Sequence, residues 1–277
     1  MSNEVKTVLD VKGLTVEFRT KDFLVSAVNS ISFSIDEGKT LALVGESGSG
    51  KTVTALSILK LLPYQIASHS QGSSIKVNGR EIMEMNPSEM RSVRGDLISM
   101  IFQEPMTSLN PYQKVGTQIE EMLIIHKGMN KKQAKQRVLT LLEKVKIPEP
   151  ELKANSYPHQ LSGGMKMRLS LARSLVLKPD YLLLDEPLSA VDELTREVLQ
   201  EEIHTLWKEE KFTAILVTHN VTEAVYLSNR VVVMSPRPGK ITHIVDIPFK
   251  KRDQKLRSST KFHKLIGDIS GKLRTWK

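Results

Sequence analysis

The residues with the clearest chemical meaning are eight consecutive residues in the first quarter of the chain. Three glycines alternate there with small or polar residues, and a lysine and a threonine follow, which is the pattern of a phosphate-binding P-loop. The glycines let successive backbone N–H groups turn inward around phosphate oxygens. The eight residues are Gly45, Glu46, Ser47, Gly48, Ser49, Gly50, Lys51 and Thr52.

The segments on either side of this loop fit its chemistry. Residues 41–44 form a short apolar run that predicts a buried strand, and residues 53–62 have apolar residues at helical spacing until Pro63. Lys51 would reach the β- and γ-phosphates of a nucleotide, and the Thr52 hydroxyl would bind Mg²⁺. A glycine-rich turn before an ordinary helix is the alternative, but strand, loop and helix together predict a nucleoside triphosphate site.

Other candidate residues stand at the ends of two further apolar runs. Residues 181–184 predict a buried strand that is followed by Asp185 and Glu186. Asp185 would bind Mg²⁺ opposite the P-loop threonine, and Glu186 could accept a proton from an attacking water. A carboxylate pair that only caps the next helix is the alternative. His219 follows the run at residues 214–218, where a lone histidine is usually structural.

A second candidate anion site lies shortly before the carboxylates. Residues 161–165 read Leu-Ser-Gly-Gly-Met and precede a predicted helix. Ser162 and the backbone N–H groups of Gly163 and Gly164 would form an anion cradle at the helix start. Because one nucleotide needs only one P-loop, a second cradle suggests that another subunit contacts the γ-phosphate.

Composition limits the class of protein. The chain has 277 residues, 40% hydrophobic and 26% charged, which suits one large α/β domain or one domain with an inserted subdomain. It has no cysteine, which excludes disulfides, thiolate metal sites and iron–sulfur clusters. The N-terminus lacks a signal peptide's apolar segment, and nowhere do about 18 apolar residues run together. We expect a cytoplasmic protein that cannot cross a membrane by itself.

The net charge of +9 is concentrated at the C-terminus. Residues 250–277 contain ten Lys or Arg against two Asp, a balance of +8, which leaves +1 for the first 249 residues. We interpret this end as a basic tail that is solvated and partly disordered, and attraction to anionic lipid headgroups is the alternative. No aromatic stacking platform or helix-turn-helix accompanies it, which argues against a nucleic-acid partner.

The order of the predicted elements indicates the fold class. Residues 8–18 alternate loosely, as an edge strand does, and Asn78-Gly79 is a hairpin signal. Strand–helix alternation around the motifs predicts an α/β fold with a mainly parallel sheet covered by helices. A helical stretch interrupts this alternation, and we interpret about residues 104–165 as an inserted subdomain. The predicted organisation is a nucleotide-binding domain at 1–249 followed by the basic tail at 250–277.

Together these motifs resemble those of the nucleotide-binding subunits of ATP-binding cassette (ABC) transporters. The resemblance covers residues 8 to about 249. Beside the P-loop, the signature at residues 161–165 and Asp185-Glu186-Pro187, it includes the positions of the family's Q-loop, D-loop and switch histidine. These are Gln103 in Phe102-Gln103-Glu104-Pro105, Ser189-Ala190-Val191-Asp192, and His219. Phe18 stands where the family stacks an aromatic ring on adenine, with a packed strand residue as the alternative.

The resemblance implies a fold, cofactors and roles for these residues. The fold would be an ABC cassette with a mainly parallel core sheet, an antiparallel β subdomain and an inserted α-helical subdomain, and the cofactors would be ATP and Mg²⁺. Glu186 would be the general base, His219 would contact the γ-phosphate, and Gln103 would respond to Mg²⁺ and the membrane subunit. Asp192 would couple the two sites of a dimer.

The resemblance also implies partners. Two cassettes would form a head-to-tail dimer, a homodimer or a pair with a sibling subunit, in which each ATP lies between one P-loop and the Ser162 and Gly164 of the other cassette. Closing on ATP and opening after hydrolysis would drive transmembrane permease subunits between access states at the cytoplasmic face of the membrane. A solute-binding protein would be an indirect partner.

Four positions depart from the family's pattern. Met165 ends the signature where glutamine is commonest, and Met167 replaces another glutamine just after it. Val191 replaces a leucine in the D-loop, and Asn220 replaces the common aspartate after the histidine. None of these changes removes a group that is assigned to a phosphate, so we expect an active ATPase.

The sequence resembles two types of importer. Up to about residue 176 it is similar to importers of oligopeptides, dipeptides and nickel, and from residue 181 onward it is closer to importers of nitrate, sulfonates and taurine. The matching segments are residues 42–51, 100–111 and 157–165 for the first type, and 192–196, 223–227 and 235–239 for the second. Because contacts with the membrane subunit lie in the first part, we expect the oligopeptide, dipeptide or nickel type. An exporter subunit and a soluble ABC ATPase that is not coupled to transport are the alternatives.

Overall fold

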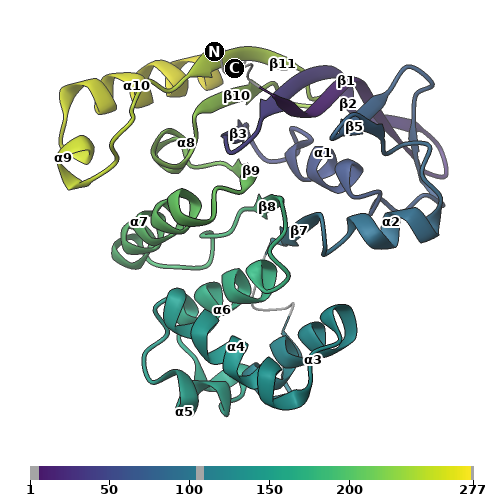
Figure 1. The fold of residues 1–277 in the computed structure, drawn as a ribbon. Helices are drawn as coiled ribbons and strands as arrows, with labels where there is room; N and C mark the ends of the chain where they lie inside the picture. Colours follow the sequence, from purple (N-terminus) through teal and green to yellow (C-terminus); the bar gives the residue numbers. More distant parts are fainter. Residues whose placement is uncertain (1–5, 104–108, 276–277) are drawn as a thin grey trace, which may run out of the picture. The chain divides into compact units, whose positions relative to one another are not determined.

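Residues 6–103 and 109–275 are described by the structure, which is a computed structural model. The chain divides into two units, one made of Met1–Arg94 with Lys211–Lys277 and the other of Gly95–Glu210. Figure 1 shows the helices and strands of each unit. The first unit contains the P-loop, and the second contains both candidate carboxylates.

A mainly parallel sheet forms the centre of the first unit. Its strands are β3 (Thr40–Val44), β9 (Thr213–Thr218), β10 (Arg230–Met234) and β11 (Ile241–Asp246). β9 and β10 lie parallel to β3 on its two sides, and β11 pairs antiparallel with β10. Every residue of β3 and β9 is buried, which explains their nearly continuous apolar sequences.

An antiparallel sheet completes the strands of this unit. Its strands are β1 (Thr7–Arg19), β2 (Leu24–Asp36), β4 (Ala67–His69), β5 (Ser74–Val77) and β6 (Arg80–Glu81). β1 pairs with β2, β4 and β5, so the prediction of an edge strand at residues 8–18 is wrong. Its loose alternation reflects one covered face, which a central antiparallel strand also has. The β5–β6 hairpin is confirmed, with positive φ angles of 49° at Asn78 and 77° at Gly79.

The basic C-terminal segment is folded. The helices of the first unit are α1 (Lys51–Ile58), α2 (Pro87–Val93), α8 (Val221–Leu227), α9 (Gln254–Arg257) and α10 (Thr260–Arg274). α10 packs against α8 and β10 (Figure 1), and it buries Phe262 and Ile269. The prediction of a partly disordered end is therefore wrong for residues 254–274. Apolar residues recur there at helical spacing, at positions 262, 265, 266, 269 and 273, a pattern that the net charge hides.

Arg252 fastens the start of this segment to the first unit. It is 6% exposed, and its guanidinium donates hydrogen bonds to Tyr226 O at 2.7 Å, Ser228 O at 2.6 Å and Phe249 O at 3.4 Å. Burial lowers the pKa of Arg252 to about 10, so the group stays charged at neutral pH. One of the cations that composition assigns to a solvated tail is therefore a buried structural group.

The second unit combines two strands with several helices. β7 (Ile98–Ile101) and β8 (Tyr181–Asp185) pair in parallel. The helices are α3 (Val115–Lys127), α4 (Lys131–Lys144), α5 (Pro150–Ala154), the short 3₁₀ helix Pro158–Gln160, α6 (Gly163–Leu175) and α7 (Glu193–Glu210). Within residues 109–165 every regular element is a helix, as the interrupted strand–helix alternation predicted.

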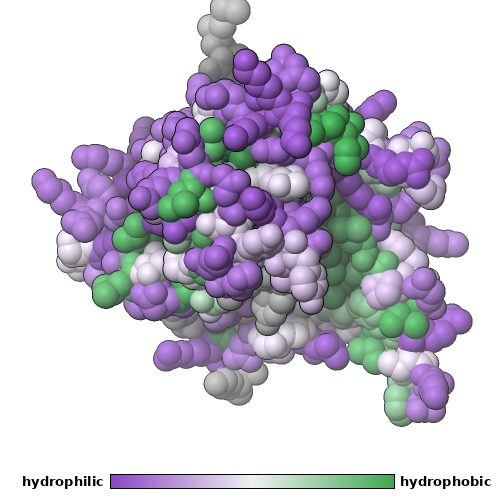
Figure 2. All heavy atoms as spheres, turned by 90° about the horizontal axis from the view of Figure 1, so that it is seen from below, coloured by the Kyte–Doolittle hydropathy of each residue, from purple (hydrophilic) through white to green (hydrophobic). Residues whose placement is uncertain are grey.

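One surface of the molecule is drawn in Figure 2. Hydrophilic residues predominate on this face, and hydrophobic side chains form smaller separate groups. Across residues 6–103 and 109–275, we find no helix with both the length and the apolar character that a membrane crossing requires.

Candidate nucleotide-binding site

The P-loop connects the buried strand β3 to the helix α1. Gly48 and Gly50 have positive φ angles of 79° and 85°, a conformation that lets neighbouring N–H groups converge on an anion. Gly50 is the N-cap residue of α1, and its carbonyl accepts a hydrogen bond from Thr54 N–H at 2.8 Å. The backbone therefore has the form that a phosphate cradle requires.

The lysine of the loop is held inside it. Lys51 is 5% exposed, and its ammonium donates to Gly45 O at 2.9 Å, Glu46 O at 3.0 Å and Ser49 Oγ at 3.4 Å. Loop and lysine thus place one positive charge within an arc of backbone N–H groups, beside the half-buried Thr52. This arrangement attracts and orients an anion with several oxygens, such as a phosphate chain.

Two glycines of the loop are required by close packing. A Cβ atom on Gly50 would lie 2.6 Å from Val28 Cγ2 and 2.8 Å from Ala27 O. A Cβ atom on Gly45 would collide with the side chain of Ser49. The loop therefore lies directly on the start of the β2 backbone and on itself, which sequence reasoning about phosphate contacts alone did not foresee.

His219 lies at the same end of the sheet as the P-loop. β9 is parallel to β3 with Thr218 opposite Val44, so His219 and the P-loop both begin where these strands end. His219 is exposed. Next to it, Asn220 caps α8 by accepting a hydrogen bond from Glu223 N–H at 3.0 Å, and Thr218 Oγ1 donates to Glu223 Oε2 at 3.0 Å. Asn220, a departure from the family pattern, thus caps the helix that follows the histidine.

Phe18 lies near the end of β1, in the antiparallel sheet. It is half-buried and pairs with Val25 of β2 and Ala67 of β4. Its ring is therefore neither fully packed in the core nor fully exposed. Stacking on adenine stays a prediction.

The second unit brings two predicted catalytic residues together. β7 and β8 are parallel with Ile101 opposite Leu184, so Gln103 and Glu186 both follow the ends of these strands. Gln103 Nε2 donates to Glu186 Oε2 at 3.4 Å. Asp185, the last residue of β8, is 1% exposed. The predicted residues Glu104 and Pro105 lie outside the described residues.

Glu186 has an uncommon backbone conformation. Its φ angle is +46°, in the left-handed region that residues other than glycine rarely adopt. Such a conformation costs about 1–3 kcal/mol. Seven other non-glycine residues in the described part of the chain also have positive φ, so the conformation by itself does not mark a functional residue. Ser189 Oγ supports it by donating to Glu186 O at 2.9 Å. The sequence gives no signal for this strain, because Glu has no preference for the conformation.

The signature residues stand at the N-terminus of α6. Ser162 is exposed, and its Oγ accepts a hydrogen bond from Met165 N–H at 3.3 Å. Gly164 is buried, and a Cβ atom on it would lie 3.0 Å from Thr195 Cγ2. The start of α6 therefore lies against Ala190 and Val191 of the D-loop at Gly163 and against the start of α7 at Gly164, while Ser162 faces solvent. The α6 helix has 13 residues, and its exposed N-terminus with a serine cap can contact an anion.

The D-loop is held by one arginine and by its own aspartate. Asp192 Oδ1 accepts a hydrogen bond from Thr195 N–H at 3.0 Å, and this backbone bond lowers the pKa of Asp192. Arg196 donates to Leu188 O at 3.3 Å and to Val191 O at 3.0 Å. Sequence reasoning missed Arg196, although its position four residues after Asp192 places it one helical turn away.

The predicted site residues thus fall into two groups. The first unit holds the P-loop, Phe18 and His219. The second unit holds Gln103, Asp185, Glu186, Asp192 and the signature residues. The P-loop and His219 in the first unit, and Gln103 and Glu186 in the second, follow the carboxyl ends of parallel strands, which is where α/β folds bind ligands.

The predicted metal ligands are oxygen donors. No group of three His, Cys, Asp or Glu side chains gathers within the part of the chain that the structure describes. Thr52, Gln103 and Asp185 offer one hydroxyl, one amide and one carboxylate oxygen. Mg²⁺ prefers such donors and is commonly held by few protein groups together with water and substrate phosphates, so this donor set fits it.

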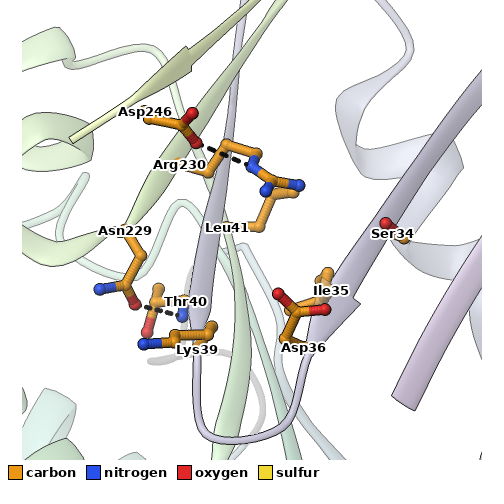
Figure 3. Close-up of a pocket in the computed structure, with 9 residues that line it drawn as sticks. All are labelled: Ser34, Ile35, Asp36, Lys39, Thr40, Leu41, Asn229, Arg230 and Asp246. Carbon is orange, nitrogen blue, oxygen red and sulfur yellow. Dashed lines mark hydrogen bonds and ion pairs between the residues drawn. The ribbon is translucent and has the colours of Figure 1, made fainter. Parts of the chain in front are cut away.

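A separate cavity of about 170 Å³ lies at the opposite end of the same sheet (Figure 3). It is lined by residues at the starts of β3 and β10, whereas the P-loop follows the end of β3. Thr40 N–H donates to Asn229 Oδ1 at 2.9 Å, and Arg230 Nε donates to Asp246 Oδ1 at 3.1 Å. These polar groups pair with one another, and the cavity is no part of the P-loop site.

Comparison with known proteins gives a consistent result. The sequence model of the ABC transporter family matches residues 28–189. The oligopeptide transport ATP-binding protein OppD of Bacillus subtilis is 42% identical over 230 residues, which is 83% of this chain and 64% of OppD. The dipeptide transport ATP-binding protein DppD of the same organism is 41% identical over 240 residues, which is 87% of this chain and 71% of DppD. The chain spans about two thirds of the length of these curated relatives.

The fold is also similar to that of a solved protein. The ATP-binding cassette MJ0796, in a dimeric post-hydrolysis structure with ADP and Pi, has a TM-score of 0.75 and 24% identity to this chain. The match covers 87% of this chain and 99% of the other. It confirms the predicted fold class, an α/β fold with a mainly parallel sheet, an antiparallel β subdomain and a helical region.

Proposed function

Because this chain belongs to the ABC transporter family, as its motifs predicted, we propose that it binds ATP and hydrolyses it to power membrane transport. The observation that carries the proposal is the P-loop, in which glycines of positive φ and the enclosed Lys51 form a cradle for phosphates. The related OppD and DppD are named for oligopeptide and dipeptide transport. We extend this substrate class to the present chain and place it with importers of oligopeptides, dipeptides and nickel.

The proposed contacts with the nucleotide are the P-loop, an aromatic ring and three oxygen donors for Mg²⁺. The P-loop N–H groups and Lys51 contact the β- and γ-phosphates, and Phe18 stacks on adenine. Mg²⁺, when bound, neutralises the phosphate charge that develops during hydrolysis. Thr52, Gln103 and Asp185 are its protein ligands, which is supported by their oxygen donors and by the burial of Asp185.

Hydrolysis depends on groups that meet the γ-phosphate and its water. The Glu186 carboxylate accepts a proton from the attacking water, and its hydrogen bond to Gln103 at 3.4 Å orients it. His219 contacts the γ-phosphate. The position of Glu186, directly after the buried strand β8 and beside Gln103, supports this role.

A second cassette completes the site. Ser162 and the first N–H groups of α6, from Gly163 and Gly164, bind the γ-phosphate of an ATP in the P-loop of the other cassette. Asp192 couples the two sites across the dimer. The exposed Ser162 supports this arrangement, and so does the dimeric state of MJ0796. The other cassette is a second copy of this chain or a sibling ATP-binding subunit.

The membrane partners are transmembrane permease subunits, which receive substrate indirectly from a solute-binding protein. The second unit has a cavity of about 310 Å³ beside the strand that leads to Gln103. It is lined by Phe102, which is 43% exposed, together with Met122 and Arg173. This mixture of apolar contact and one cation suits a short helix of a membrane subunit, which supports our proposal that the chain lies peripherally at the cytoplasmic face of the membrane.

The resemblance of the C-terminal third to importers of nitrate, sulfonates and taurine stays a prediction and gives the alternative substrate class. Uptake in cells that lack this chain separates the two classes. Restoring the wild-type chain is expected to restore uptake of a labelled tripeptide, and restoring Glu186→Gln is expected not to. Restored taurine or nitrate uptake with no change in peptide uptake would overturn the substrate class. An ATPase that restored neither, and bound no permease, would favour the soluble type.

A further inference from the structure

The connection between β10 and β11 packs against the P-loop. Gly239 N–H donates to Ala27 O at 3.0 Å, and Asn29 N–H donates to Gly239 O at 2.9 Å. A Cβ atom on Gly239 would collide with Ser49 O. This connection, residues 235–240, is thus fixed to β2 and lies against the phosphate loop without any space between the two backbones.

Arg237 is at the exposed tip of this connection. It stands between Pro236 and Pro238, and prolines restrict both their own backbone and that of the residue before them. A Cβ atom on Gly48 would lie 3.8 Å from Arg237 Nη2 and within 4 Å of nothing else. The guanidinium therefore lies directly beside the turn of the P-loop. The two prolines limit the conformational freedom of the backbone that carries it.

The Arg237 guanidinium makes no polar contact within the described part of the chain. Arg237 is exposed. Glu46, the acidic residue of the P-loop, forms no ion pair with it. Arg237 also lies outside residues 28–189, the segment that the family's sequence model matches. A rigidly presented cation without a structural partner is typical of a binding group.

We propose that Arg237 is a further phosphate-binding residue of the nucleotide site. The proposal rests on the proposed function of the P-loop and adds to it a second cation beside Lys51. The nucleotide phosphates are favoured as its ligand, because the element that Arg237 adjoins is itself an anion cradle. A guanidinium suits this role, since its planar set of donors binds phosphate oxygens in pairs and it stays charged at all physiological pH values.

Isothermal titration calorimetry with ATP, ADP and AMP tests the proposal on the full chain, in EDTA to prevent hydrolysis and at concentrations where the chain is monomeric. Arg237→Ala is expected to raise the Kd for ATP and ADP about tenfold, because one charge-assisted phosphate contact is lost. The effect on AMP should be smaller, since AMP lacks the phosphates that lie in the loop. Arg237→Lys should recover part of the affinity, as a point charge without the paired geometry.

Lys240→Ala is the matched control. Lys240 is an exposed cation three residues away on the same connection, so this variant removes the same charge from the same surface and should leave the Kd for ATP unchanged. Equal Kd values for Arg237→Ala and wild type would overturn the proposal. Unchanged affinity in the monomer together with weaker ATP-dependent dimerisation would also overturn it, by assigning Arg237 to the other cassette. A wild-type chain that bound no nucleotide would instead overturn the proposed function itself.

Discussion

Replacing Glu186 with glutamine is expected to lower kcat for ATP hydrolysis by at least about a hundredfold while ATP still binds. The amide has the size of the carboxylate and can still contact Gln103, but it cannot accept a proton from the attacking water. The phosphate cradle lies in other residues, so affinity for ATP should stay within about threefold of the wild-type value, a loss of less than one typical hydrogen bond. Steady-state phosphate release and nucleotide titration measure the two effects separately.

The same variant should trap the ATP-bound dimer, which sizing in the presence of ATP would show. Glu209→Gln is the control, because Glu209 is a largely exposed carboxylate on α7 whose Oε2 lies 3.5 Å from Lys144 Nζ. It should hydrolyse ATP at the wild-type rate. Near-normal turnover by Glu186→Gln would show that another group accepts the proton, and the assignment of the general base would be wrong.

Replacing Gly50 with alanine is expected to weaken ATP binding about 10- to 100-fold, from the strain that it places on the loop. The added Cβ atom would lie 2.6 Å from the fully buried Val28 and 2.8 Å from the Ala27 carbonyl, neither of which can move freely. The φ angle of +85° is also unfavourable for alanine. The loop must therefore shift, and the converging N–H groups lose their geometry. Titration with ATP measures the loss.

Gly72→Ala is the matched control for this experiment. Gly72 has no heavy atom within 4 Å of an added Cβ atom and no positive φ angle. Its replacement should change neither ATP affinity nor thermal stability by a measurable amount. If Gly50→Ala bound ATP as tightly as the wild type, the loop would not need the conformation seen here, and the phosphate cradle would have to be formed by other groups.

The parts of the site that the sequence predicts are those in which the chemistry lies in consecutive residues. The P-loop, the signature and the carboxylate pair each carry their glycines, hydroxyls or charges within a few positions, so pattern and flanking elements are enough to predict them. The parts that remained hidden depend on contacts between distant segments. The hydrogen bond of Gln103 to Glu186 spans 83 positions. Arg237 lies beside Gly48 of the P-loop, although it belongs to the connection between β10 and β11.

Two errors about the fold have a common physical origin. The pairing of β1 on both sides and the folding of α10 both depend on neighbours that are far away in sequence. A local alternation cannot show how many strands lie beside it. A count of charges cannot show that Phe262 and Ile269 form a buried stripe on a basic helix, because such a helix is stabilised mainly by packing its apolar face.

Mixing two inactive variants tests most directly whether hydrolysis needs two cassettes. Lys51→Ala removes the P-loop cation, and Ser162→Phe blocks the signature, so each variant alone should hydrolyse ATP at a small fraction of the wild-type rate measured at the same concentration. In a mixed dimer, one site combines an intact P-loop with an intact signature from the other chain. We predict that the mixture regains hydrolysis well above either variant alone. A mixture as inactive as its components, beside an active wild-type chain, would contradict a site shared between two chains.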